Sequence, residues 1–146
     1  MKTKSLKSYK TPLRYPGGKS RALSKLFQFI PDLKDYTEFR EPFLGGGSVA
    51  IEIGKRYPHI DIWVNDLYEP LYNFWKVLQS DGDKLKDILL QLKQRHPDFG
   101  SAKQLFLDAK DYLAKPVGNS IDRAVAFYVV NKCSFSGLTE SSAFSK

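Results

Sequence analysis

A glycine triplet stands at the centre of the stretch Arg40-Glu41-Pro42-Phe43-Leu44-Gly45-Gly46-Gly47-Ser48-Val49. The alternating residues Tyr36–Arg40 before it predict a strand, and Ser48–Arg56 after it predict a helix. Glycine lets the backbone approach a ligand closely, and the first N–H groups of a helix bind polar or anionic atoms. The loop therefore favours a nucleoside ligand over a purely structural turn, although Ala50 breaks the dinucleotide fingerprint G-x-G-x-x-G.

The next predicted strand, Asp61–Asn65, ends at Asp66, which follows Gly45 by 21 residues. A carboxylate at this place in a wound α/β sheet accepts the two hydroxyl protons of an adenosine ribose. An acidic residue after a strand is also a common helix cap, so the position alone leaves both roles open. Strand, glycine loop, helix, strand and helix together predict the opening of an α/β fold.

The rest of the chain is mainly helical in pattern. Apolar spacing predicts helices over 23–30, 67–79, 83–95, 102–115 and 121–133, followed by a polar, serine-rich segment over 134–146. The helices after the second strand read as an excursion from the sheet, which predicts a helical subdomain.

A second glycine motif reads Leu13-Arg14-Tyr15-Pro16-Gly17-Gly18-Lys19-Ser20. Its last residues imitate a phosphate loop, but that loop's first glycine would have to stand where Leu13 stands, so the motif argues against ATP binding. The turn instead presents the Tyr15 ring and the Lys19 ammonium on a stiff Pro-Gly-Gly support.

The charge of the chain is concentrated at one end. The 146 residues have a net charge of +7, and residues 1–25 hold eight basic side chains and no acidic one. A basic arm on a neutral body predicts a polyanionic partner, nucleic acid first, although a solvated tail is the alternative reading.

Three classes of protein are excluded by composition. No apolar run has the length of a membrane span, and the single Cys133 forms no internal disulfide. With His59 and His96 as the only histidines, no metal site is expected. The expectation is a cytoplasmic protein without metal and without a membrane partner.

Four ordered segments resemble the Dam-type, adenine-specific DNA methyltransferases that use S-adenosylmethionine. They are Arg14–Lys19, Arg40–Val49, Val64–Leu67 and Phe127–Leu138. The resemblance implies a bacterial or phage-encoded enzyme with an incomplete Rossmann-like methyltransferase sheet and an inserted helical DNA-recognition subdomain. Residues 1–80 would form the cofactor-binding part and residues 81–146 the recognition subdomain.

The resemblance also implies roles for individual residues. Cofactor binding would fall to Tyr15, Pro16, Gly17, Gly18, Lys19, Glu41, Pro42, Phe43, Leu44, Gly45, Gly47, Ser48, Asp66 and Leu67. Tyr15 and Lys19 would line the methionine side of S-adenosylmethionine, with Lys19 also near the target base. Double-stranded DNA would be contacted by Lys10, Arg14, Tyr128, Asn131, Lys132, Ser134, Phe135 and Ser136.

One family motif is missing from the sequence. The family's reaction uses an Asp/Asn-Pro-Pro-Tyr/Phe motif on the flipped adenine, and this chain has no Pro-Pro pair. The expectation is therefore an N-terminal part of such an enzyme, inactive alone, which a C-terminal polypeptide would complement. The alternative is a non-catalytic DNA-binding remnant that keeps the basic arm.

Overall fold

The computed structural model describes residues 9–116, 118–137, 139 and 142–145. Lys2, Lys4 and Lys7 of the predicted basic arm lie outside the described residues, as does the side chain of Ser136. The chain divides into two compact units, 17–65 with the N-terminal end of the chain, and 66–146 with Leu13–Pro16. This division differs from the boundary expected after residue 80, and the functions assigned to the two parts stay predictions.

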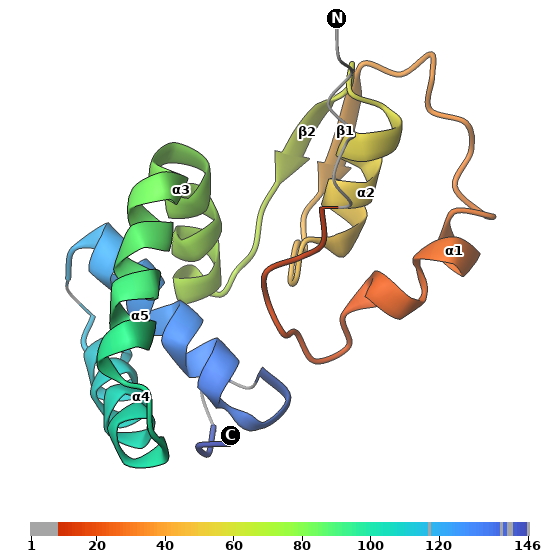
Figure 1. Ribbon diagram of the computed structural model, residues 1–146. Helices are drawn as coiled ribbons and strands as arrows, with labels where there is room; N and C mark the ends of the chain where they lie inside the picture. The colour runs from red at the N-terminus through yellow and green to blue at the C-terminus, as the bar shows by residue number, and fades with distance from the viewer. Residues whose placement is uncertain (1–8, 117, 138, 140–141, 146) are drawn as a thin grey trace, which may run out of the picture. The chain divides into compact units, whose positions relative to one another are not determined.

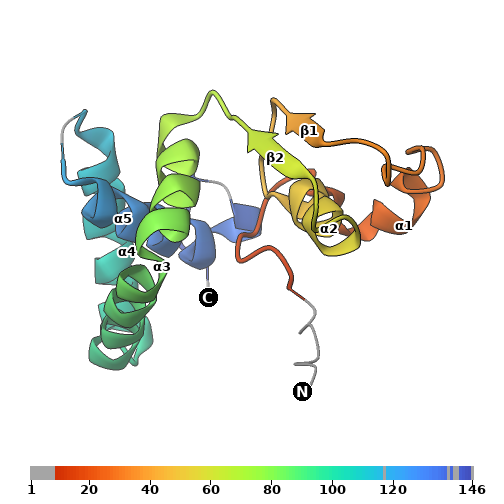
Figure 2. The same ribbon diagram turned by 90° about the horizontal axis from the view of Figure 1, so that it is seen from above.

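The first unit is built on a small parallel sheet. Strands β1 (Glu38–Glu41) and β2 (Asp61–Val64) pair in parallel, and helix α2 (Ser48–Arg56) connects them. Figures 1 and 2 show α2 lying against one face of the sheet. A mixed helix and strand fold is thereby confirmed, while the expected first strand begins two residues later than its pattern predicted.

The packed face of this sheet carries the core of the first unit. Phe39 and Ile62 contact a buried cluster of aliphatic side chains, Leu33, Val49, Ile53 and Ile60. The short helix α1 (Leu23–Leu26) adds Leu23 and Leu26 to the same cluster, and the 3-10 turn η1 (Lys19–Arg21) precedes it. On the strands, alternate side chains point away from this core, and Trp63 is 63% exposed.

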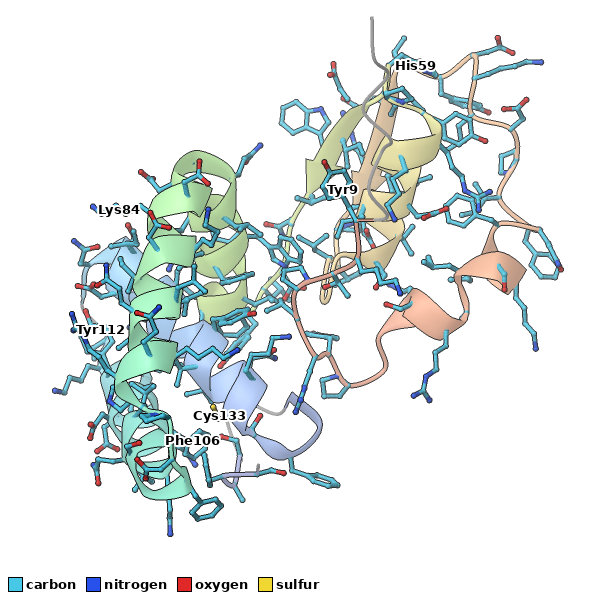
Figure 3. The ribbon with its side chains drawn as sticks, viewed as in Figure 1. Tyr9, His59, Lys84, Phe106, Tyr112 and Cys133 are labelled. Atoms are coloured by element: carbon cyan, nitrogen blue, oxygen red, sulfur yellow. The ribbon has the colours of Figure 1, made fainter. Side chains whose placement is uncertain are left out.

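The second unit is a bundle of three helices (Figure 1). They are α3 (Glu69–Arg95), α4 (Phe99–Ala114) and α5 (Ser120–Cys133), followed by the 3-10 turn η2 (Phe135–Gly137). Helix α5 contacts α3 through one buried cluster and α4 through another. Because α5 has neighbours on both sides, it is apolar around most of its circumference. Phe106 and Cys133, labelled in Figure 3, belong to the cluster between α4 and α5.

Two predicted helices prove to be one element. The patterns over 67–79 and 83–95 join into α3, which bends where Asp81 leaves helical geometry with φ −134° and ψ 34°. Side-chain oxygens cap the other two helices. Asp98 accepts a hydrogen bond from the Ser101 N–H at the start of α4, and Asn119 accepts one from Ile121 at the start of α5.

Candidate functional site

The glycine loop of the first unit has a backbone that only glycine adopts easily. Gly45 and Gly47 have φ of 52° and 69°, in the left-handed region. The Leu44 N–H donates to the Asn65 carbonyl at 2.9 Å, which ties the loop after β1 to the end of β2. Both features hold the loop at the carboxyl ends of two parallel strands, where α/β proteins bind ligands.

Glu41 connects the first strand to the helix that follows the loop. Its side chain is buried, and Oε2 accepts the Ala50 N–H of α2 at 3.1 Å. Gly47, at the N-cap of α2, has no side chain, so Glu41 satisfies an N–H group that a capping residue would otherwise bind. Burial raises the pKa of Glu41, while Lys19 and the Ala50 hydrogen bond act in the opposite direction.

The second glycine motif meets the first at this point. Lys19 Nζ lies 3.4 Å from Glu41 Oε1, and Ser20 Oγ lies 2.7 Å from Ser48 Oγ. These contacts join segments about 20 to 30 residues apart in the sequence into one polar corner of the first unit. The structure therefore brings together four residues predicted to bind cofactor, Lys19, Glu41, Gly47 and Ser48.

A hollow of about 400 Å³ lies beside this corner. It is lined by Arg40, Glu41, Pro42, Trp63, Val64 and Asn65. Arg40, Trp63 and Asn65 were not among the predicted site residues. These residues come together because β1 and β2 pair in parallel, with Arg40 opposite Trp63. Only a prediction of this pairing could have indicated them. Phe43, from the glycine loop, is 68% exposed.

Four of the predicted cofactor residues, Tyr15, Pro16, Asp66 and Leu67, belong to the second unit, whereas Gly17 and Gly18 belong to the first. Asp66 Oδ1 accepts the Tyr68 N–H at 3.1 Å, which closes a short turn before α3; the N-cap residue of α3 is Tyr68, and no side chain caps that helix. Burial, and next to it the charge of Asp66, raise the pKa of Tyr15. Leu67 is 86% exposed. Tyr15 and Asp66 are thus close enough to interact within their own unit.

Two predicted DNA contacts do not fit the structure. Asn131 is 1% exposed and Ser134 is fully buried, and both side chains are hydrogen-bonded inside the protein. A direct DNA contact by Asn131, as the resemblance implied, does not agree with this burial, because its amide binds backbone groups of two other segments.

The other described residues predicted to contact DNA keep exposed or half-buried side chains. Lys10 and Arg14 are exposed, and Phe135 is 67% exposed. Lys132 is half-buried with Nζ 5.4 Å from the centre of the Tyr128 ring, and Tyr128 stacks on Phe74. Burial, with the charge of Arg14, lowers the pKa of Lys132. Tyr128 therefore packs against the hydrophobic core, and its contact with DNA stays a prediction.

Neither metal-site nor membrane-span geometry is found in the described part of the chain. Over those residues, no three His, Cys, Asp or Glu side chains are grouped as a metal would need. Within the same residues, no helix is both long and apolar enough to cross a membrane.

Similar proteins include two named DNA methyltransferases. The DNA N-6-adenine-methyltransferase of Escherichia phage P1 is 30% identical over 126 residues, which cover 86% of this chain and 15% of the phage protein. The type II methyltransferase M.MjaIII of Methanocaldococcus jannaschii is 28% identical over 133 residues, covering 86% of this chain and 46% of that protein. The chain spans less than half the length of both relatives.

The match to a family profile extends over almost the whole sequence. The profile of the D12 class N6 adenine-specific DNA methyltransferases matches residues 15–145. The match begins at Tyr15 in the second glycine motif and includes the glycine loop, both strands and the three long helices. This chain belongs to the D12 class family of N6 adenine-specific DNA methyltransferases.

Proposed function

We propose that this chain forms the S-adenosylmethionine-binding and DNA-binding part of an adenine-specific DNA methyltransferase with a Rossmann-like sheet. The observation that carries the proposal is the polar corner of the first unit, where Lys19 and Ser20 meet Glu41 and Ser48 beside the glycine loop. Two sequence motifs with cofactor chemistry converge there, next to a hollow at the carboxyl ends of the strands.

The residues of this corner fit the chemistry of the cofactor. S-Adenosylmethionine, when bound, supplies an electrophilic methyl group on a sulfonium. Its methionine part also carries a carboxylate, which the Lys19 ammonium would attract, and the exposed Phe43 ring offers an apolar surface for the purine. Glu41 holds Lys19 and the start of α2 in place, so its first role is to position the other groups.

Asp66 and Tyr15 would contribute further cofactor contacts. Asp66 is one residue beyond Asn65, whose carbonyl binds the glycine loop, and a carboxylate there would accept the ribose hydroxyl protons. Leu67 would cover one face of the adenine. These assignments, together with Pro16, Gly17 and Gly18 in the N-terminal turn, rest on the family resemblance.

DNA would be bound by the basic residues of both ends of the chain. Lys10, Arg14 and Lys132 would contact phosphates, and the exposed Phe135 ring would lie against a base or sugar. These 146 residues contain no Pro-Pro pair, so we assign binding functions to them and no step of methyl transfer. Transfer activity in the presence of a C-terminal polypeptide that carries the motif would show complementation.

A second candidate function is cofactor-independent DNA binding. It is favoured by Arg14 and Lys132, two like charges near enough for one to lower the pKa of the other. Such a module would bind DNA with a steep salt dependence. The slope of the logarithm of the binding constant against the logarithm of the salt concentration would become shallower by about 0.9 for each phosphate contact removed. It would be indifferent to S-adenosylmethionine.

Cofactor binding can be followed with a tryptophan that lines the hollow. The chain has two tryptophans, and Trp75→Phe leaves Trp63 as the single reporter. We expect S-adenosylmethionine or its demethylated product to change Trp63 fluorescence saturably and to release heat in a calorimetric titration. Asp66→Ala should weaken binding about tenfold or more, because hydrogen bonds to a charged group contribute about 1.5–3 kcal/mol.

The matched control is another carboxylate of the first unit. Glu52→Ala removes an acid that pairs with Lys55 and Arg56 on the surface of α2, and it should leave cofactor affinity unchanged. A folded parent chain that gives neither heat nor a fluorescence change would contradict the cofactor assignment. Equal affinities of the parent and Asp66→Ala would remove Asp66 from the site.

A further inference from the structure

One buried side chain joins two segments that are far apart in the sequence. Asn131 Oδ1 accepts the Arg14 N–H at 3.0 Å, while Nδ2 donates to the Arg14 carbonyl at 2.6 Å and to the Gly137 carbonyl at 3.1 Å. A side-chain amide has two N–H donors and one oxygen acceptor, so these bonds occupy both donors and the oxygen. All three residues belong to the second unit.

The backbone of Gly137 approaches the same point closely. Gly137 has φ +74°, and a Cβ added there would clash with the Arg14 carbonyl oxygen. No side chain fits in that space, so the turn η2 rests directly against the Arg14 backbone. On the other side, Leu13 is buried in the cluster between α3 and α5. Arg14 is therefore fixed at its backbone while its side chain is exposed.

The clamp formed by Asn131 on the Arg14 backbone places two cations near each other. Lys132 follows Asn131 directly, and Asn131 holds the Arg14 backbone through two hydrogen bonds, so the two basic residues lie in the same part of the fold. Burial, and after it the Arg14 charge, lower the pKa of Lys132. Two neighbouring cations repel each other, which a protein tolerates best where an anion will neutralise both. A backbone held rigidly in advance also reduces the entropy lost when such an anion binds.

We propose that Asn131 is a positioning residue, whose amide fixes the Arg14 backbone on the turn η2 so that Arg14, Lys132 and the turn meet a phosphodiester backbone as one surface. The inference rests on the DNA binding proposed above and replaces the expected direct DNA contact of Asn131. Asn131 is only 1% exposed, and its amide makes three hydrogen bonds inside the protein. The amide is therefore not available to bind a ligand directly.

A double-mutant cycle on the full chain tests positioning directly. Affinity for a short double-stranded DNA of mixed sequence is measured for Arg14→Ala, Asn131→Ala and the double variant at several salt concentrations. We expect each single variant to bind several-fold more weakly, with a salt slope reduced by about 0.9, and the double variant to match Arg14→Ala within about twofold. Losses that multiply, or an unchanged affinity of Asn131→Ala, would overturn the proposal.

A second asparagine of the same helix gives the matched control. Asn119 caps the start of α5 through the Ile121 N–H, so Asn119→Ala weakens the helix without touching the clamp. It should leave the DNA affinity and the salt slope unchanged. If Asn119→Ala lowers the affinity as much as Asn131→Ala does, then general helix stability explains the effect and the positioning role is wrong.

Hydrogen exchange tests the clamp without DNA. In the parent chain the Arg14 amide should exchange slowly, and Asn131→Ala should accelerate it selectively, while Asn119→Ala should not. If Asn131→Ala fails to fold, Gly137→Ala disturbs the same contact from the other side and should give the same selective exchange. A parent chain that binds no DNA would contradict the proposed function, whereas fast exchange of Arg14 in the parent would overturn the clamp itself.

Discussion

The two compact units are stabilised in different ways. In the helical unit, α5 packs between α3 and α4 with fully buried aromatic rings, among them Phe74, Phe106 and Phe127. In the sheet unit, the buried cluster consists of four aliphatic side chains, and Trp63 and Phe43 remain largely exposed. The sheet unit also holds the polar corner around Glu41.

The difference separates a scaffold from a binding surface. Ligand-binding loops are commonly drawn from the less stable parts of a fold, because they need freedom to adjust. The glycine loop combines left-handed glycines and a hydrogen bond to the end of β2 with burial of residues 44–48, while the neighbouring Phe43 ring is exposed. The two tryptophans allow each unit to be followed alone: Trp63 reports on the sheet unit and Trp75 on the helical unit.

The largest effect is expected in the helical core. Phe127 is 1% exposed and its ring contacts those of Phe74 and Tyr68. Phe127→Ala, in a Trp63→Phe background, should lower the free energy of unfolding by about 3–5 kcal/mol in urea. Phe135→Ala is the control, because that ring is 67% exposed and its removal should change stability by less than about 0.5 kcal/mol. Similar losses for both variants would contradict the assigned core.

Glycines of the two units should respond in opposite directions to the same substitution. Gly47→Ala forces alanine into a left-handed backbone and should cost about 1–2 kcal/mol, followed by Trp63 in a Trp75→Phe background. Gly82→Ala lies inside α3, where an added Cβ makes only ordinary contact with Leu78, and should add about 0.5–1 kcal/mol. A neutral Gly47→Ala would show that residue 47 does not hold a left-handed backbone in the folded loop.

Local patterns predicted most of the elements, and long-range contacts account for the differences. The sequence predicted α2 with its observed bounds. Its signals are local, because apolar residues at helical spacing follow the glycine triplet and end at basic residues. It split α3 in two at residues 80–82, since Ser-Asp-Gly is typical of a turn, whereas packing on α5 continues the helix through the bend at Asp81. The start of β1 depends on its register with β2, which no single segment reveals.

In the candidate site too, local motifs predicted some residues, while long-range contacts determine others. The motifs predicted Lys19, Glu41 and Ser48 as site residues, and the structure brings them together in one unit. The resemblance predicted Asn131 as a DNA contact, but its burial had no local signal, because the backbone groups of Arg14 that it binds lie 117 residues earlier in the chain. The sequence predicts Trp63 only as part of a strand, since its place in the hollow depends on the pairing of the strands.

The smallest expected effect concerns the pH dependence of the sheet unit. Burial raises the pKa of Glu41 above its ordinary value of 4.5, so the folded state holds this proton more tightly than the unfolded state. The contribution of Glu41 to stability is therefore fully present below the unfolded pKa and is lost as the pH rises through the folded pKa. Glu41→Gln cannot titrate and should lack this loss.

The measurement is a comparison of two unfolding curves as a function of pH. Urea unfolding of the sheet unit, followed by Trp63 from pH 4 upward, should show the parent losing stability relative to Glu41→Gln. Carboxylates with lowered pKa, such as Glu52, give the opposite slope in both proteins and cancel in the difference. Parallel curves would mean that Glu41 is not desolvated in the folded chain, and the polar corner would then be an open, solvated surface without a buried carboxylate.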